Sequence, residues 1–395
     1  MLRVWGKPRK EIFMKHVSAK LLTLGLLSIG AALTSCGRSA PDEDNKIHLQ
    51  LVPSNDPATL LTRAKALEPI LKRYEPNYEW TIDVGSTYAA TTTALAAGQI
   101  DGGFLTASGY AQMTIEKPGK TKLLLSASRS AYKVQADDFP GIKKENLEQQ
   151  RKAMNGANGY VYRGEQSEKE VDFYCSIVIT LKDSEREALN LPKLDGDGDG
   201  EVSLKEIHDG NAVWGVMGAT SSSGYIYPTK YIYEGGYTGG FVDKAAYESK
   251  SKEEQAKLMI GNTEKSYPAM VDDLLSGQID VAVGFFDIRY GSAFTQSGGK
   301  YFQDEAVFTK TYTQAVLDPI MNDTVCARGD LSDAKSEAIR NALKKAVKDG
   351  GKDEEGTGAW LLYQIYSHTG YINGDDANYD AAREMYRWTM EHSTK

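Results

Sequence analysis

Short apolar strands alternate with amphipathic helices over the first part of this chain, and this alternation constrains its fold more than any other feature. We expect strands at 46–52, 80–84 and 100–105, separated by helices at 60–74 and 87–97. The helical segments place apolar residues at helical spacing, and the strand segments are short and bounded by turn and cap residues. Such alternation is typical of an α/β lobe.

Two short sequences occur twice. Gly-Gln-Ile-Asp stands at 98–101 and again at 277–280, each time between the end of a helix and an apolar strand. Ser-Gly-Tyr stands at 108–110 and 223–225, each time after an apolar strand. The distance between the copies is far too long for a repeat protein, so they indicate two lobes of similar construction. Ligands of open α/β sheets bind beyond the carboxyl ends of the strands, where the Ser-Gly-Tyr copies would lie.

The N-terminal residues have the pattern of an export signal. Six basic residues accompany an apolar run at 21–33, which is shorter than the roughly 20 residues that a membrane-spanning helix needs. The run ends in Leu33-Thr-Ser-Cys36, which resembles a bacterial lipobox and implies cleavage before Cys36 and lipid attachment to its thiol. A plain secretory signal is the alternative, and Met14 is a second candidate start. We expect a signal peptide at 1–35 and a polar tether at 36–45.

Length and charge limit the class of protein. Removing the signal takes away six basic residues and one acidic residue, so the formal net charge falls from −8 to −13. A surface this acidic argues against a nucleic acid as partner. The remaining 360 residues are too many for one small core and suit two lobes.

The stretch 213–228 combines an apolar strand, a turn rich in hydroxyl groups and the start of an aromatic helix. Ser221, Ser222 and Ser223 are good capping residues, and Pro228 fits inside a first helical turn, where backbone N–H groups lack partners. Free N–H groups at the positive end of a helix dipole, beside serine hydroxyls, form a site for an anion. An ordinary capped helix is the alternative interpretation.

Residues 195–206 match the EF-hand calcium loop at every constrained position. Expected oxygen ligands are Asp195, Asp197, Asp199, Ser203 and Glu206, together with the carbonyl of Glu201. Four carboxylates this close repel one another, and a hard cation such as Ca²⁺ removes that cost. We expect one structural calcium ion that pins the turn before the serine-rich stretch, and an acidic surface turn is the alternative.

Several short segments spread over the mature chain resemble motifs of one known family. They are Val52-Pro-Ser54, Tyr88-Ala, Ala94 to Asp101, Ser108-Gly-Tyr110, Ser221 to Pro228, Gly277 to Asp280, Pro319 to Asp323 and Asp330-Leu. In these segments the chain resembles the substrate-binding lipoproteins of phosphonate, phosphite and phosphate ABC importers, a PhnD-like family of type II periplasmic binding proteins. The run from Ser221 to Pro228 is the most specific of the matches.

The resemblance implies an α/β fold of two lobes, joined by two hinge crossovers that close on the ligand, with the calcium loop as an insertion. We expect the first part of lobe 1 at 46–172, lobe 2 at 173–318, and a return to lobe 1 with C-terminal helices at 319–395. The resemblance also implies no catalysis and the delivery of a phosphorus oxyanion to an ABC permease and its ATPase. The protein would be a monomer, lipid-anchored to the outer face of the bacterial cytoplasmic membrane.

Both lobes supply the ligand-binding residues that the resemblance implies. They are Ser54, Tyr88, Ser108 and Tyr110 from lobe 1, and Ser221, Ser222, Ser223, Gly224, Tyr267 and Asp287 from lobe 2. Tyr267 stands where many relatives have a His, and because a phenol does not titrate near neutrality the choice of ligand can differ. Asp287 would face the cleft and take an ammonium group or a proton of the ligand, unless Arg289 neutralises it or it only caps a turn.

Two other functions compete with this interpretation. A secreted phosphoesterase is disfavoured because the four His of the mature chain are scattered and no Gly-x-Ser-x-Gly motif surrounds the serines. A calcium-stabilised surface lipoprotein that binds another small ligand would be favoured by a flat surface in place of a cleft. Cys175 and Cys326 either form one disulfide or remain buried free thiols.

Overall fold

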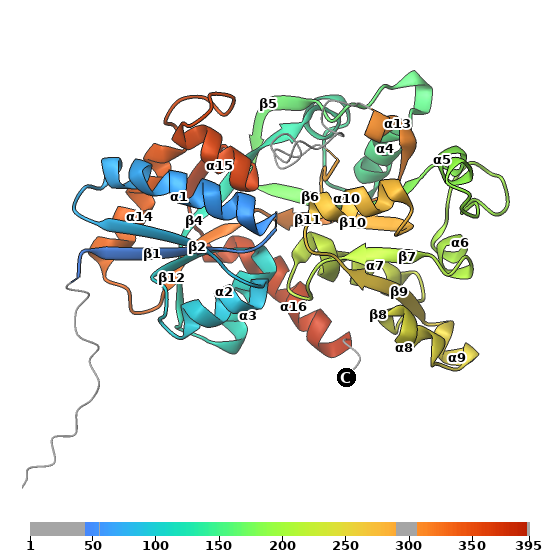
Figure 1. Ribbon diagram of the computed structural model, residues 1–395, viewed down its shortest axis with the longest axis horizontal. Coiled ribbons are helices and arrows are strands. Elements are labelled where there is room, and N and C mark those ends of the chain that lie inside the picture. Colours follow the sequence, from blue (N-terminus) through green and yellow to red (C-terminus); the bar gives the residue numbers. More distant parts are fainter. Residues whose placement is uncertain (1–43, 55, 290–305, 393–395) are drawn as a thin grey trace, which may run out of the picture. The chain divides into compact units, whose positions relative to one another are not determined.

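The computed structural model describes residues 44–54, 56–289 and 306–392. The signal peptide expected at 1–35, the lipidation site Cys36 and most of the tether lie outside these residues. Within the described ranges, no helix combines the length and the apolar composition needed to cross a membrane. The described residues form two mixed β-sheets with helices packed on them (Figure 1).

Seven strands form the first sheet. In spatial order they are β13 (Gly370–Asn373), β4 (Thr121–Tyr132), β12 (Thr324–Arg328), β3 (Gly102–Leu105), β1 (Lys46–Leu51) and β2 (Glu79–Val84), and β5 (Gln166–Val171) pairs with β4 off this path. β1 runs parallel to β2 and β3, whereas β12 is antiparallel to β3 and β4. The strands expected at 46–52, 80–84 and 100–105 are thus confirmed.

Helices cover both faces of the first sheet (Figure 1). α1 (Pro57–Tyr74), α14 (Asp333–Ala346) and α15 (Gly358–Tyr366) share one hydrophobic core with it. α2 (Tyr88–Ala96), α3 (Ala107–Glu116) and α16 (Asp380–His392) share another. Neighbouring residues of one strand divide between these cores, as Phe104 and Leu105 do, because successive strand side chains point to opposite faces.

The second sheet has six strands. In order they are β11 (Thr311–Met321), β6 (Phe173–Leu181), β10 (Val281–Phe285), β7 (Val213–Val216), β9 (Leu258–Thr263) and β8 (Gly240–Val242). Its helices are α5 (Asp183–Ala188), α6 (Leu204–Asp209), α7 (Tyr227–Glu234), α8 (Lys244–Glu248), α9 (Lys252–Gln255), α10 (Tyr267–Ser276) and α13 (Ala306–Lys310), with a π-helical turn at Ser222–Ile226. Cys175 in β6 and Cys326 in β12 are buried free thiols, and burial raises the pKa of each to about 12.

The repeated Gly-Gln-Ile-Asp sequence builds the same junction in each sheet. The carboxylate of Asp101 accepts the backbone N–H of His48 at 2.9 Å, and that of Asp280 accepts the N–H of Val213 at 2.8 Å. The second carboxylate oxygen of Asp101 accepts a hydrogen bond from Arg328 Nε at 3.2 Å, and that of Asp280 accepts one from Arg186 at 2.8 Å. Each aspartate, which directly precedes β3 or β10, therefore ties that strand to the neighbouring strand β1 or β7, so the repeated sequence has the same structural role in both sheets.

The two sheets are joined where β5 continues into β6 and where β11 continues into β12. These crossovers lie side by side, because the N–H of Asn322 donates to the carbonyl of Asp172 at 2.9 Å and its side chain donates to the carbonyl of Val171 at 2.9 Å. The segment 133–165, between β4 and β5, is a further connection. Its helix α4 packs against β11 of the second sheet, whereas the sequence analysis assigned this segment to lobe 1.

From its polar and poorly periodic sequence, the segment 137–171 is predicted to be an elaborated loop, and this prediction is wrong. The segment contains a helix, α4 (Lys144–Met154), and the strand β5. α4 buries Leu147, Ala153 and Met154, but it also buries two polar residues, Gln150 and Arg151. These polar residues on the buried face obscure the apolar periodicity by which a helix is recognised.

Candidate ligand-binding site

Four helices that begin shortly after a strand carry most of the expected ligand-binding residues. In the first sheet, Tyr88 opens α2 and Ser108 lies in the first turn of α3. In the second, Ser221 caps the π-helical turn that leads into α7, and Tyr267 opens α10. Side chains at the four N-caps, Thr87, Thr106, Ser221 and Ser266, each accept a backbone N–H three residues further on. The capping chemistry therefore fixes where each of these side chains stands.

Two serines hydrogen-bond to each other between the lobes. Ser222 Oγ donates to Ser108 Oγ at 2.8 Å, and the backbone N–H of Ser108 donates to Ser222 Oγ at 3.2 Å. Thr106 Oγ1 donates to the carbonyl of Thr220 at 3.4 Å beside them. Both serines are buried, so the two lobes meet at these helix starts.

Tyr267 joins the other two serines. Its hydroxyl lies 3.1 Å from Ser221 Oγ and 3.1 Å from Ser223 Oγ. Ser221 Oγ accepts the N–H of Gly224 at 3.3 Å, which leaves its own proton for another acceptor. Burial raises the pKa of Tyr267, so the phenol is neutral at physiological pH. The group is a buried cluster of neutral hydrogen-bond donors.

Glycine is required beside this cluster. A Cβ at Gly224 would stand 2.7 Å from the Tyr267 hydroxyl and 2.5 Å from Met217 Cγ. A Cβ at Gly284 in β10 would stand 2.7 Å from the ring of Tyr267. The ring of Tyr267 also meets Phe285 edge-on at 4.9 Å. These contacts hold the tyrosine in one position.

A buried group of ionisable side chains, which the sequence analysis did not identify, centres on Asp323. Arg129 pairs with Asp323 at 2.6 Å and stacks on Tyr174, and His368 Nε2 lies 3.4 Å from the same carboxylate. The nearby Arg129 and His368 hold the pKa of Asp323 below its usual value although burial raises it. Arg129 Nε is buried and has no hydrogen-bond partner among the described residues. The pair brings no net charge, so neutral donors dominate the site.

Further tyrosines surround this group. Burial, with the charge of Asp323 as a smaller cause, raises the pKa of Tyr88, Tyr174 and Tyr366 well above the usual value. The hydroxyl of Tyr366 donates to the carbonyl of Val52 at 2.7 Å. The helix starts, the ionic group and the tyrosines therefore form one buried polar region.

Tyr110 and Asp287 do not take the places that we expected. The Tyr110 hydroxyl donates to Asp376 at 2.5 Å, and its ring packs on Tyr379. Asp287 is fully buried and pairs with Arg289 at 2.7 Å, so Arg289 neutralises it. Neither side chain is free for a ligand.

The remaining expected residue, Ser54, follows β1 in a tight turn. Its backbone N–H donates to the carbonyl of Val52 at 3.0 Å, and the side chain is half-buried. Tyr366 donates to the same carbonyl, so Ser54 lies close to the tyrosines.

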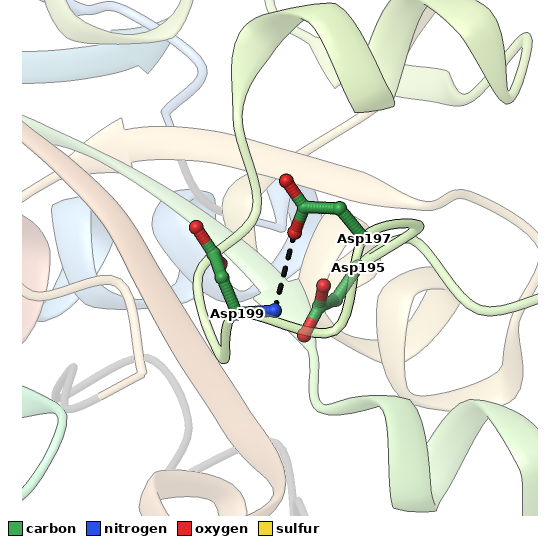
Figure 2. Close-up of side chains that lie close together, drawn as sticks. All are labelled: Asp195, Asp197 and Asp199. Atoms are coloured by element: carbon green, nitrogen blue, oxygen red, sulfur yellow. Dashed lines mark hydrogen bonds between the residues drawn. The ribbon is translucent and has the colours of Figure 1, made fainter.

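The acidic loop 195–206 gathers its carboxylates. Oxygens of Asp195, Asp197 and Asp199 lie within 4.8 Å of one another (Figure 2). Glu206 reaches back and accepts the N–H of Gly196 at 2.8 Å, while Ser203 and Glu206 form a capping box at the start of α6. The side chain of Glu201 points to Arg151, which donates a hydrogen bond to it at 3.1 Å. The backbone carbonyl of Glu201 is therefore the group of this residue that we expect to bind a cation. Three of the expected ligands, the aspartates, therefore lie close together in the folded loop.

Two sheets joined by adjacent crossovers, with buried polar helix starts meeting between them, define a two-lobed binding protein. Residues 49–379 match the family model described as the phosphonate ABC transporter periplasmic substrate-binding protein. The chain belongs to this family, whose members are substrate-binding proteins of transporters rather than enzymes.

Solved structures share the fold at low sequence identity. A Xanthomonas citri protein bound to ATP is 13% identical, with a TM-score of 0.54 and coverage of 89% of this chain and 100% of that one. A binding protein component of an ABC phosphonate transporter from Pseudomonas aeruginosa is 13% identical, with a TM-score of 0.55 and coverage of 88% and 87%. PhnD1 from Prochlorococcus marinus in complex with methylphosphonate is 11% identical, with a TM-score of 0.55 and coverage of 88% and 99%. No curated protein sequence matches the chain.

Proposed function

We propose that this protein is the extracytoplasmic substrate-binding component of an ABC importer and that it binds a phosphorus oxyanion, namely a phosphonate, phosphite or phosphate, between its lobes. The contact between Ser108 and Ser222 is the main support, because it places hydroxyl donors from both lobes at one point. An oxyanion there would accept the hydrogen bond that Ser222 now donates to Ser108, together with hydrogen bonds from the hydroxyls of Ser221, Ser223 and Tyr267, which now bond to one another. Neutral donors and helix starts stabilise such a charge without burying an unpaired cation.

An importer subunit of this kind acts with membrane partners outside the cytoplasm. The monomeric protein would deliver its ligand to a permease and its ATPase, and a lipid on Cys36 would hold it at the outer face of the bacterial cytoplasmic membrane. Mass spectrometry of the protein from membranes tests the anchor, since diacylglycerol on Cys36 gives a defined mass increase. An unmodified N-terminus after cleavage at another residue would contradict it.

Calorimetry with methylphosphonate, phosphite, phosphate and sulfate, and with sugars, amino acids and a phosphate ester as competing candidates, tests the ligand class. We expect at least one phosphorus oxyanion to bind, and Ser222→Ala to weaken that binding about 10- to 100-fold, because charged hydrogen bonds contribute about 1.5–3 kcal/mol. Ser249→Ala, at the exposed end of α8, is the matched control. Binding of sugars or amino acids alone would favour a lipoprotein for another ligand. Release of phosphate from an ester would favour the phosphoesterase.

We also propose that 195–206 binds one structural Ca²⁺ through the oxygens of Asp195, Asp197, Asp199, Ser203 and Glu206 and the carbonyl of Glu201. Convergence of three carboxylates supports this, since the ion would remove their repulsion. Calcium should raise the melting temperature of the wild type, and Asp195→Asn should abolish the rise. Asp209→Asn, exposed just beyond the loop, should leave it unchanged. A wild-type melting temperature that ignores both calcium and chelator would overturn the proposal.

A further inference from the structure

The segment 133–165 leaves the first sheet at a defined point. β4 pairs with β13 as far as Ser128, and beyond that residue it pairs only with β5, from Arg129 to Tyr132. The two strands end together, because the N–H of Lys133 donates to the carbonyl of Glu165 at 2.9 Å. The segment thus starts and finishes at one narrow neck.

Beyond the neck, the segment is fastened to the second lobe by α4 and its C-terminal end. Asn155 acts toward β11 as a neighbouring strand would: its Nδ2 donates to the carbonyl of Thr313 at 2.8 Å, and its Oδ1 accepts the N–H of Thr313 at 2.8 Å. Arg151 donates to Tyr312 at 2.9 Å and to Glu201 of the acidic loop at 3.1 Å. α4 packs against β11, which follows α13 in the chain.

Residues at the neck, where the segment 133–165 joins β4 and β5, pack against the residues that follow β10. The hydroxyl of Tyr162 donates to Asp287 at 3.0 Å, and its ring meets Phe308 edge-on at 5.4 Å. The ring of Tyr132 packs on Phe286 at 5.1 Å. Tyr132, Tyr162, Phe286 and Asp287 are all buried, so these contacts are part of a core.

We propose that 133–165 is a strap that moves with the second lobe and restrains the opening of the cleft. The chain then passes between the lobes four times, at the two crossovers and at the two strands of the neck. Opening must bend the hydrogen-bonded pair of β4 and β5 near Ser128 as well as the crossovers. A two-stranded ladder resists this bending more than two single strands would. The strap does not depend on which ligand the cleft holds.

The backbone N–H of Ser108 reports on opening, because it bonds to Ser222 across the lobes. Hydrogen exchange of the ligand-free full chain, followed in peptides covering 105–113, should be roughly threefold to tenfold faster in Asn155→Ala, which removes two hydrogen bonds to β11. Lys152→Ala, exposed on the same helix, is the control and should match the wild type. Peptides from β9 should exchange at an unchanged rate. Equal acceleration of β9 and 105–113 would mean general destabilisation and would overturn the proposal.

A second variant removes the strap. Replacing 134–164 by Asn-Gly joins Lys133 to Glu165 in a two-residue hairpin turn, which suits paired strand ends. Exchange at 105–113 should then be faster than in Asn155→Ala. Exchange at the wild-type rate in both variants would show that 133–165 does not restrain opening. If the excised chain does not fold, the comparison of Asn155→Ala with Lys152→Ala decides.

Discussion

At the scale of single residues, the site depends on how closely Tyr267 fits. Gly224 and Gly284 leave room for its ring and hydroxyl, and Ser221 and Ser223 take hydrogen bonds with it. The serines and Tyr267 were identified from the serine-rich motif and the family resemblance, and their role in ligand binding stays a prediction. Arg129 and His368 were not identified, since they come from distant elements and meet Asp323 only in the folded chain. For Asp287 the sequence offered a carboxylate that faces the ligand or one neutralised by Arg289, and the structure shows the pairing with Arg289.

Glu264 should give stability a pH dependence. Burial, together with a hydrogen bond to Asp273, raises its pKa to about 7. The folded protein therefore holds a proton that the unfolded chain releases above its lower pKa, so this contribution is complete at acidic pH and is lost as the pH rises through about 7. Glu264→Gln mimics the protonated group, and its melting temperature should fall less than that of the wild type between pH 6 and pH 8. Identical profiles, or a difference equalled by the exposed Glu253→Gln, would refute this account.

At the scale of elements, capping and turn residues made the sequence informative. The sequence predicts an amphipathic helix at 330–348 capped by Ser332, and α14 begins directly after that residue. The repeated Gly-Gln-Ile-Asp begins with the glycine that ends α2 or α10 and marks the same junction in both sheets. α4 was missed because its buried face includes a glutamine and an arginine. Side chains that satisfy one another inside the fold look like solvent-exposed positions in the sequence.

The junction at Asp280 predicts a large loss of stability. In Asp280→Ala the nearly inaccessible Arg186 loses its carboxylate partner and keeps, among the described residues, only the carbonyl of Pro192, and the N–H of Val213 loses its acceptor. Breaking a buried ion pair in this way costs about 3–5 kcal/mol, which denaturant unfolding measures. Asp318→Ala breaks an exposed pair with Lys230 and should cost less than about 1 kcal/mol. Comparable losses in the two variants would contradict the role assigned to the junction.

At the scale of the whole molecule, α16 reaches from the first lobe to the second. It packs on α3, and at its far end Trp388 and His392 meet Tyr233 of α7 at 5.2 and 4.8 Å. The alternation of strands and helices predicted an α/β lobe, the repeated short sequences and the chain length predicted a second lobe, and the family resemblance predicted the crossovers. No local pattern predicted which helices touch both sheets, because that depends on how the sheets are joined.

Removing this aromatic contact should favour an open form. Trp388→Ala loses ring contacts that contribute about 0.5–1.5 kcal/mol, so the open population should rise roughly 2- to 10-fold. The radius of gyration from small-angle scattering should increase in the ligand-free variant. Met390→Ala, exposed on the same helix, serves as the control. An unchanged radius in Trp388→Ala would mean that the contact does not hold the lobes together.

The two buried cysteines have a practical consequence. With a pKa of about 12, each thiol is almost wholly protonated in neutral buffer, and reagents such as maleimides attack the thiolate. A cysteine introduced on an exposed helix of either lobe would therefore react selectively, with Cys175 and Cys326 left in place and Cys36 blocked by the proposed lipid. Paired fluorophores attached in this way would follow the distance between the lobes in single molecules, without redesigning the native core.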